Sequence, residues 1–236
     1  MIKKAAILAA GEGSRLKSVG TYKPIIKINK RPLIEIMLLN LAQLKIKKTL
    51  IIFNEDEKKM DLSEVPSLKL PNIEYFFKST KSSLHSLQEI NHKLKVKENE
   101  HYFISMVDSI ILPNEIFRFF TFCQSLTKEE SAIIATPFID DESPLTLEIN
   151  EQGYITEFQT PIDGNTLVTS GVYCFSGTLN KLMEKLISDG NTKMRFFLTE
   201  AINQNHKIRV FQSKKTLDID RPEDIKIAEI FLSENL

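Results

Sequence analysis

The first 140 residues alternate short apolar runs with longer segments in which apolar residues recur at helical spacing. The apolar runs are residues 4–8, 49–53, 73–77, 102–107 and 132–138, and the helical segments begin at Pro32, Ser82 and Pro113. Short runs rich in Ile, Phe and Tyr are typical of strands, whereas apolar residues three and four apart indicate helices. Because strands that are separated by helices pair in parallel, this rhythm predicts a mostly parallel sheet with helices on both faces.

The pattern changes after residue 140. Residues 145–159 form two alternating runs around Glu151-Gln152-Gly153, which is typical of a hairpin and adds an antiparallel portion to the sheet. The later elements expected are a strand at 170–175, helices at 179–187 and 195–203, a strand at 207–211 and a helix from Pro222. No repeat, low-complexity tract or linker interrupts the chain, so we expect residues 1–236 to form a single α/β domain with a mixed, mostly parallel sheet.

Composition narrows the range of partners. The chain has 31 basic and 31 acidic residues, so neither a nucleic acid nor an acidic membrane surface is expected as a partner. The apolar start at residues 5–10 is shorter than the apolar part of a secretion signal, and no run approaches the roughly 20 apolar residues of a membrane span. We therefore expect a cytoplasmic protein. Cys123 and Cys174 lie in apolar surroundings and are expected to be buried free thiols, and the four histidines show no zinc-ligand spacing.

The stretch LAAGEGSRL, residues 8–16, places a loop of small residues directly after the first strand and ends with a cation, Arg15; a second cation, Lys23, follows. Backbone N–H groups of a glycine-rich turn can point at a phosphate, and no Cβ blocks its approach. The dinucleotide fingerprint does not fit, because Leu16 stands where its third glycine belongs, and the P-loop ending Gly-Lys-Ser/Thr is absent. On the loop alone, a phosphate site and a plain tight turn with two solvated cations are both open.

The whole stretch LAAGEGSRL, followed by Lys23-Pro24, resembles the signature of the nucleotidyltransferases that activate sugar 1-phosphates and related phosphates. The segments VTSGVYCF (168–175), FFLTEAI (196–202) and LDIDRPEDIKIAE (217–229) resemble later motifs of that family, in the family order. The resemblance implies a Rossmann-like three-layer α/β/α sandwich with the active site across the carboxyl edge of the sheet. It also implies a reaction that joins a nucleoside triphosphate to a sugar 1-phosphate and gives an NDP-sugar and pyrophosphate.

The resemblance assigns roles to single residues. Arg15 would hold the triphosphate and stabilise charge in the transition state, and Lys23 would neutralise the α-phosphate or the incoming phosphate. Ser82 or Ser83 would help to recognise the base, or would simply cap the helix that follows. The loop after the first strand would contact the base and the phosphates. Its residues are Leu8, Ala9, Ala10, Gly11, Glu12 and Gly13.

Magnesium is the implied cofactor, since one or two carboxylates and the substrate phosphates suffice to hold Mg²⁺. Asp108 ends the strand YFISMVD and matches the family position of the first carboxylate. The second would come from Asp218 or Asp220. We expect these two side chains to point to opposite faces of an extended segment, so that only one of them faces the metal, with Asp220 preferred. Without the resemblance, Asp108 would be interpreted as a turn residue and Asp220 as the N-cap of the last helix.

The chain departs from the family pattern at three places. Val107 replaces a glycine, Tyr22 replaces a proline, and Gln159-Thr160-Pro161 stands where the family has the Glu-Lys-Pro segment that contacts the sugar. The last change removes two charges and leaves the nature of the acceptor open. A phosphorylated alcohol such as phosphocholine, handled by related cytidylyltransferases, is one alternative. A non-catalytic sensor of nucleotide sugars is another, although the retained cations and aspartates argue against it.

The acceptor site itself is expected around Gly171, which lies in the family-like strand, and around the segment NTKMRFF. In that segment Lys193 or Arg195 would supply a cation to an acceptor phosphate, unless both are solvated loop residues. A glycosyltransferase with a similar sheet is disfavoured, because its Asp-x-Asp is expected in the middle of the chain, whereas Asp218-Ile219-Asp220 lies near the end of this sequence.

Overall fold

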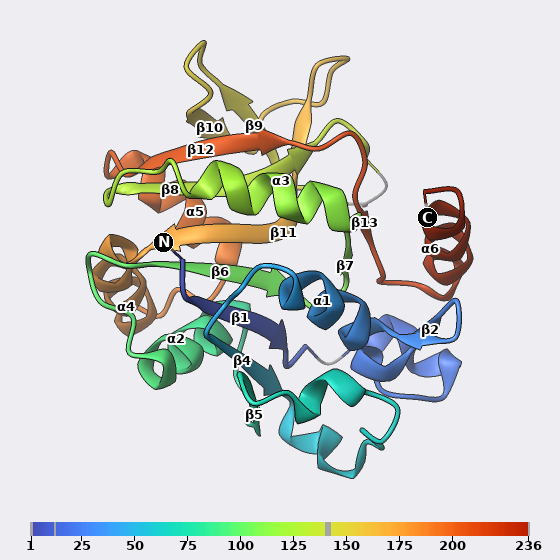
Figure 1. The fold of residues 1–236 in the computed structure, drawn as a ribbon. Helices are drawn as coiled ribbons and strands as arrows, with labels where there is room; N and C mark the ends of the chain where they lie inside the picture. Colours follow the sequence, from blue (N-terminus) through green and yellow to red (C-terminus); the bar gives the residue numbers. More distant parts are fainter. Residues whose placement is uncertain (1, 12, 140–142, 236) are drawn as a thin grey trace.

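The computed structural model describes residues 2–11, 13–139 and 143–235, and a nine-stranded sheet forms its centre (Figure 1). Four neighbouring strands run in parallel in the order β5 (Ile73–Phe77), β4 (Lys48–Phe53), β1 (Lys4–Ala9) and β6 (His101–Met106). β1, the first strand in the sequence, thus lies in the middle of the parallel part. Its carboxyl end opens directly onto the loop that begins at Ala10, so the sheet topology places this loop at the centre of one edge.

The other strands extend the sheet beyond β6. β11 (Leu167–Ser176) runs antiparallel to β6 and to β8 (Glu130–Thr136), and β12 (Lys207–Gln212) pairs in parallel with β8. The predicted hairpin is present as β9 (Thr146–Ile149) and β10 (Ile155–Phe158), and it joins the start of β11. Two short ladders stand apart from the main sheet, namely β2 (Lys27–Ile28) with β3 (Arg31–Pro32) and β7 (Ser109–Ile110) with β13 (Leu217–Asp218).

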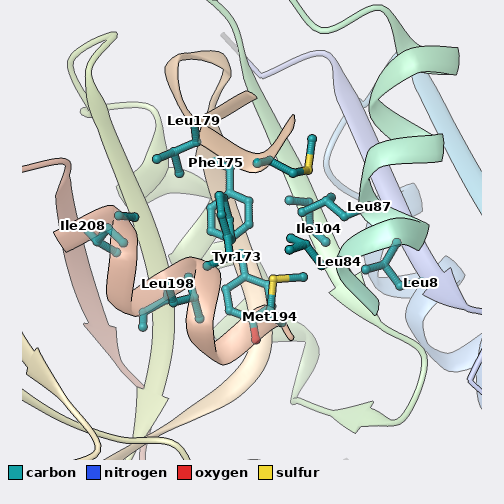
Figure 2. Close-up of a cluster of buried hydrophobic side chains, with 14 of the residues drawn as sticks. Leu8, Leu84, Leu87, Ile104, Tyr173, Phe175, Leu179, Met194, Leu198 and Ile208 are labelled. Carbon is teal, nitrogen blue, oxygen red and sulfur yellow. The ribbon is translucent and has the colours of Figure 1, made fainter. Parts of the chain in front are cut away.

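Helices cover both faces of the sheet, as the sequence predicts. One face carries α1 (Leu33–Ala42) and α3 (Pro113–Cys123), and the other carries α2 (Ser83–Leu94), α4 (Asn180–Ser188) and α5 (Met194–Asn203). Alternate strand residues serve the two layers: Ile7 packs in the cluster of α1 and α3, whereas Leu8 packs in the cluster of α2, α4 and α5 (Figure 2). The three-layer α/β/α sandwich follows from this alternation.

A third apolar cluster lies at the carboxyl edge of the sheet. The last helix, α6 (Pro222–Ser233), contributes Ala228 and Phe231, and these pack with Leu16 and Ile219. Leu16 lies in the 3₁₀ turn η1 (Ser14–Val19), directly after the glycine loop. The cluster therefore holds the C-terminal segment against the loop that follows β1. The other 3₁₀ turns are η2 (Lys23–Ile25), η3 (Glu55–Lys59), η4 (Pro66–Lys69) and η5 (Gly177–Leu179).

The structure agrees with the expected elements to within a few residues. The clearest difference is β8, which ends at Thr136 instead of residue 138, because Pro137 has no N–H to donate to a ladder. Cys123 and Cys174 are buried free thiols, as expected. Within the part of the chain that the structure describes, no helix has the length and apolar character needed to span a bilayer.

Candidate active site

Two acidic segments from distant parts of the chain meet at the carboxyl edge of the sheet. Asp108 follows β6, and Asp220 follows β13. The β7–β13 ladder pairs Ser109 with Asp218, and the N–H of Ile219 donates to the carbonyl of Asp108 at 3.0 Å. This pairing fixes the two segments side by side, so the aspartates are placed by backbone hydrogen bonds and not by flexible loops.

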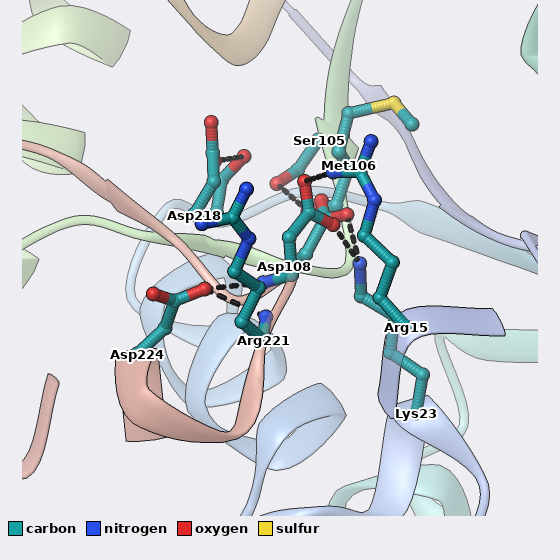
Figure 3. A network of polar contacts seen from close by, with 10 residues as sticks. Arg15, Lys23, Ser105, Met106, Asp108, Asp218, Arg221 and Asp224 are labelled. Carbon is teal, nitrogen blue, oxygen red and sulfur yellow. Dashed lines mark hydrogen bonds and ion pairs between the residues drawn. The ribbon is translucent and has the colours of Figure 1, made fainter. Parts of the chain in front are cut away.

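The ammonium of Lys23 lies between the carboxylates of Asp108 and Asp220. Figure 3 shows Lys23 and Asp108 in this cluster. Nζ of Lys23 is 2.6 Å from Oδ2 of Asp108 and 2.8 Å from Oδ1 of Asp220. The Lys23 side chain is only 8% exposed. Burial on its own would lower the pKa of Lys23, but the charges and hydrogen bonds of Asp108 and Asp220 outweigh it, so the pKa is raised and the group stays an ammonium at neutral pH.

Arg15 reaches the same cluster from η1. Its Nη1 is 3.7 Å from Oδ2 of Asp220, and its side chain is more than half exposed. Such a long, solvated contact holds the guanidinium only weakly. Arg15 is therefore available to an incoming phosphate, whereas Lys23 is already bound by two partners.

The glycine loop leaves room beside these cations. A Cβ added at Gly11 would meet no atom within 4 Å, whereas Gly13 has a positive φ of 54° and lies against the Cβ of Lys23. Gly13 therefore makes the turn that packs onto Lys23, and Gly11 leaves the open approach that a phosphate needs. Glu12, which was also expected to contact the nucleotide, lies outside the described residues.

A cavity of about 250 Å³ lies on one side of the loop. Ala10 and Gly11 form its loop wall, and Ser82 and Ser83 form part of the wall opposite. Ser82 is the N-cap of α2, with its Oγ accepting from the N–H of His85, and it also donates to the carbonyl of Thr192. The capping role of Ser82 is thus confirmed, and the cap residue borders the cavity as well.

The side chains of Leu8 and Ala9, at the end of β1, lie on opposite faces of the sheet. The side chain of Leu8 borders the same cavity, whereas that of Ala9 is buried in the cluster of α1 and α3 on the opposite face. Only the backbone of Ala9 lies at the edge of the sheet. This difference again follows from the alternation of side chains along a strand.

A second cavity, of about 280 Å³, opens on the other side of Asp108, between β6, β8, β11 and α5. Gly171 lines it, as expected for an acceptor site. Its φ is +72°, and a Cβ there would lie 2.3 Å from Oγ of Ser109, so only glycine fits. Ser109 Oγ in turn donates to Oδ1 of Asp218 at 3.1 Å.

The cation at this cavity is Arg195 and not Lys193. Among the described residues that form its wall are Met194 and Arg195, from the first turn of α5, whereas the exposed Lys193 precedes the helix and is not part of the wall. Nη2 of Arg195 donates to the carbonyl of Ser143 at 3.0 Å, which fixes the guanidinium at the rim. The segment named from the sequence does border this cavity, but the start of α5 decides which of its side chains lines the wall.

Asp218 and Asp220 both line this cavity. The expectation that they point to opposite faces was wrong, because residues two apart in an extended segment lie on the same side, and it is Ile219 between them that points into the core. Asp220 is also not the cap of α6. Arg221 is the N-cap, and Asp224 in the first turn accepts from the N–H groups of Asp220 and Arg221 at 2.9 and 2.7 Å. The carboxylate of Asp220 is bound instead by Lys23.

The carboxylates fit a divalent cation that is shared with a phosphate ligand. Asp108 and Asp220 converge on one cationic atom, and hard cations such as Mg²⁺ take one or two carboxylates together with phosphate oxygens and water. Among the described residues, no group of three or more His, Cys, Asp or Glu side chains is arranged to hold a metal ion. The site therefore suits a cation that arrives with a phosphorylated substrate better than a cation held in an all-protein cage.

Of the three departures from the family pattern, Tyr22 is the one found among the described residues that line a cavity at the site. Val107 is buried in the core, and its N–H donates to the carbonyl of Leu8 at 3.1 Å. Tyr22 packs against the cluster of α1 and α3 and also lines a cavity together with Gly11, Gly13 and Lys23. Gln159 and Thr160 are not among the described residues that line the cavity beside Asp108, so the lost charges of that segment do not change its wall.

Sequence reasoning missed two polar residues next to the loop, Asn54 and Glu57. Asn54 directly follows β4, whereas Asp108 stands two positions after the end of β6, and Asn54 is 8% exposed. Both residues line a third cavity, of about 590 Å³, together with Gly11, Gly13 and Lys23. Burial raises the pKa of Glu57 to about 7. A polar residue directly after a buried parallel strand is the signal that would have found Asn54.

A parallel sheet whose carboxyl edge carries a glycine loop, two cations and converging carboxylates defines a class of α/β proteins that bind phosphorylated ligands at that edge. Residues 5–203 match the family of MobA-like NTP transferase domains. The chain belongs to this family and is a nucleotidyltransferase. No curated protein sequence matches the chain.

Solved structures agree with this fold over the whole chain. The inositol-1-phosphate CTP transferase from T. maritima is 20% identical, with a TM-score of 0.79 over 98% of this chain and 95% of that one. A UDP-glucose pyrophosphorylase in complex with UDP-glucose is 17% identical, with a TM-score of 0.78 over all of both chains. A putative glucose-1-phosphate thymidylyltransferase from Bacillus anthracis is 16% identical, with a TM-score of 0.78 over 97% of this chain and 94% of that one. At these identities the likeness confirms the fold.

Proposed function

We propose that the chain joins a nucleoside triphosphate to a sugar 1-phosphate or a similar phosphorylated acceptor and releases pyrophosphate. The observation that carries the proposal is the position of Lys23. Its ammonium contacts the two carboxylates that border one cavity, while its own side chain and the glycine loop border another. A cation at that junction is placed to neutralise two phosphates that must approach each other.

In this reaction an oxygen of the acceptor phosphate attacks the α-phosphorus of the triphosphate. The bond from the α-phosphorus to the oxygen that bridges to the β-phosphate breaks, and pyrophosphate leaves with the electron pair. Little proton transfer is required, so the tasks of the protein are alignment and charge neutralisation. Arg15 would hold the triphosphate with its forked guanidinium, and Lys23 would neutralise the α-phosphate region as a compact charge.

We infer that Asp108 and Asp220 would hold Mg²⁺. When bound there, the ion would neutralise phosphate charge. Asp218 would support the site from the side, since its carboxylate accepts from Ser109 and lines the acceptor cavity. The nucleoside base would lie in the cavity beside Ser82 and Ser83.

The walls of the second cavity support a hydroxyl-rich acceptor. Ser109, Thr136 and Thr169 offer side-chain hydroxyls, and Arg195 offers a cation for the acceptor phosphate. Phosphocholine is the alternative acceptor to include, because Phe138 and Tyr173 also line the cavity and aromatic faces attract quaternary ammonium groups. The buried free thiols and the nucleoside triphosphate donor support a cytoplasmic location.

The test is a matrix of nucleoside triphosphates against sugar 1-phosphates, inositol 1-phosphate and phosphocholine, with pyrophosphate release measured with and without Mg²⁺. We expect one combination to turn over, and Asp108→Asn and Arg15→Ala to lose that turnover without unfolding. Asp61→Asn, which alters an exposed carboxyl, is the control and should leave the rate unchanged. If the protein binds a nucleotide sugar tightly but no combination turns over, the proposed activity is wrong and the protein acts as a sensor of nucleotide sugars.

A further inference from the structure

The side chain of Asn54 joins the glycine loop to the segment that borders the Ser82 cavity. Asn54 follows the last residue of β4, and the register of β1 and β4 pairs Ala9 with Phe53, so Asn54 lies next to Ala10. Its Nδ2 donates to the carbonyl of Ala10 at 3.1 Å, and its Oδ1 accepts from Oγ of Ser79 at 2.9 Å.

The orientation of this amide is fixed by its partners. The carbonyl of Ala10 can only accept, so it requires Nδ2, whereas the backbone N–H of Asp56 can only donate and contacts Oδ1 at 3.1 Å. The side chain is 8% exposed, so water competes little for these bonds. If the Nδ2 donor of Asn54 is removed, the buried carbonyl of Ala10 loses this hydrogen bond at the start of the loop.

The two hydrogen-bond partners of Asn54, Ala10 and Ser79, lie in or next to the segments that line the cavity proposed for the nucleotide. Ala10 precedes Gly11, and Ser79 precedes the residues 80–83 that line the cavity with Ala10 and Gly11. We propose that Asn54 is a positioning residue for the nucleotide, because its single amide sets the distance between the loop and the segment after β5. This inference rests on the proposed function, since it assigns the Ser82 cavity and the loop to the nucleoside triphosphate.

The alternative role of Asn54 is to cap the turn η3 without any effect on the nucleotide site. One substitution distinguishes this capping role from the positioning role. Oδ1 of Asn54 caps the turn η3, where Glu57 accepts from the N–H of Asn54 at 3.1 Å in a capping box. Asn54→Asp keeps an oxygen for the N–H of Asp56 and for Ser79, but it places a second oxygen against the carbonyl of Ala10. The cap is therefore retained while the link to the loop is lost.

Asn72 provides a matched control. Its Nδ2 also donates to a backbone carbonyl at 3.1 Å, that of Ile46, but it lies before β5, at the amino end of the parallel strands. Asn72→Asp removes the same kind of bond at the edge of the sheet opposite the loop. Asn54 is buried and Asn72 only half-buried, so Asn54→Asp should cost more thermal stability than Asn72→Asp. Asn54→Ser, which adds no charge, is therefore measured beside both variants, and a loss of nucleotide binding that it shares with Asn54→Asp reports the lost link and not a new charge near the phosphates.

The experiment measures the Kd of the unaltered protein and both variants for the nucleoside triphosphate by calorimetry, and the KM values for triphosphate and acceptor. We expect Asn54→Asp to raise the Kd and KM for the triphosphate about tenfold, which is the loss of one buried hydrogen bond, and to leave the KM for the acceptor unchanged. Asn72→Asp should change neither KM. Amide hydrogen exchange should also become faster at Ala10 and Gly11 in the Asn54 variant alone.

An unchanged triphosphate Kd in Asn54→Asp, or an equal rise in Asn72→Asp, would overturn the positioning role while the proposed function stands. Failure of the unaltered protein to bind any nucleoside triphosphate would overturn the proposed function, and this inference with it. If Asn54→Asp does not fold, Asn54→Ser replaces it, because a serine keeps a cap oxygen but is too short to reach Ala10, and the same outcomes apply.

Discussion

Replacing Lys23 with methionine tests whether the two carboxylates that it joins form a cation site. The change keeps the length of the side chain but removes the charge between Asp108 and Asp220. Both carboxylate oxygens lie within 2.8 Å of the same nitrogen, so without Lys23 they face each other at short range. We expect the variant to lose turnover, and to bind a divalent cation more tightly than the unaltered protein when no nucleotide is present.

The size of the effect follows from the geometry. Two like charges about 5 Å apart repel by about 3 kcal/mol at an effective dielectric constant near 20. Asp220 is 43% exposed and Asp108 21%, so solvent screening reduces this to about 1–2 kcal/mol. For a chain of this size, that loss corresponds to a fall in Tm of about 2–8 °C. A divalent cation that takes the place of the ammonium should remove this repulsion of about 1–2 kcal/mol. The variant should therefore bind the cation about tenfold more tightly than the unaltered protein.

The assay is Mn²⁺ binding by electron paramagnetic resonance, together with Tm measured against Mg²⁺ concentration, for the nucleotide-free proteins. Mg²⁺ should raise the Tm of Lys23→Met more than that of the unaltered protein, since a ligand stabilises only the state that binds it. Lys27→Met is the matched control, because Lys27 also contacts a carboxylate at 2.6 Å, that of Glu64, but both side chains are exposed. If Lys23→Met binds Mn²⁺ no more tightly than Lys27→Met, Asp108 and Asp220 do not form the cation site.

Three further changes probe the surroundings of the site. Burial raises the pKa of Glu57 to about 7, above its unfolded value of about 4.3, so the contribution of Glu57 to folding stability falls as the pH rises from 4 to 7. Glu57→Gln should therefore match the unaltered protein at pH 4 and exceed it by about 2–4 kcal/mol at pH 8 in urea unfolding. Gly171→Ala should cost about 1–3 kcal/mol, and adding Ser109→Ala should recover part of this; equal stability of the single variant and the unaltered protein would contradict the close contact. Gly11→Ala should keep the Tm but lose triphosphate affinity, whereas Gly164→Ala, also free of neighbours, should keep both.

Local pattern was sufficient for the main strands and helices and for the clustering of the charged residues, but it did not predict the short ladders β2–β3 and β7–β13. The strand at residues 73–77 has the predicted bounds, and the family motif brought Arg15, Lys23 and Asp108 together as expected. What failed was the direction of single side chains. Lys193 and Arg195 differ in whether they line the cavity beside Asp108 because α5 begins between them, and no residue pattern in that segment marks its first turn.

Long-range contacts account for the remaining differences. Gly171 is required by Ser109, which lies 62 positions earlier in the sequence, and Asn54 acts on Ala10 across 44 positions. Such contacts arise only after the strands have paired in register, so no window of sequence contains them. The common orientation of Asp218 and Asp220, in contrast, does follow from the sequence, because residues two apart in an extended chain lie on the same side. The prediction that they point to opposite faces was therefore wrong.

The short β7–β13 ladder has a consequence for the order of refolding. It joins Ser109 to Asp218, which are 109 positions apart, whereas the neighbouring strands β1 and β4 are connected through about 40 residues. Closing the longer connection carries the larger entropic cost, and the acidic pair exists only once it is closed. After dilution from denaturant, far-UV circular dichroism should therefore recover before Mn²⁺ binding does, and a chain caught between these two events would be folded in its sheet yet inert.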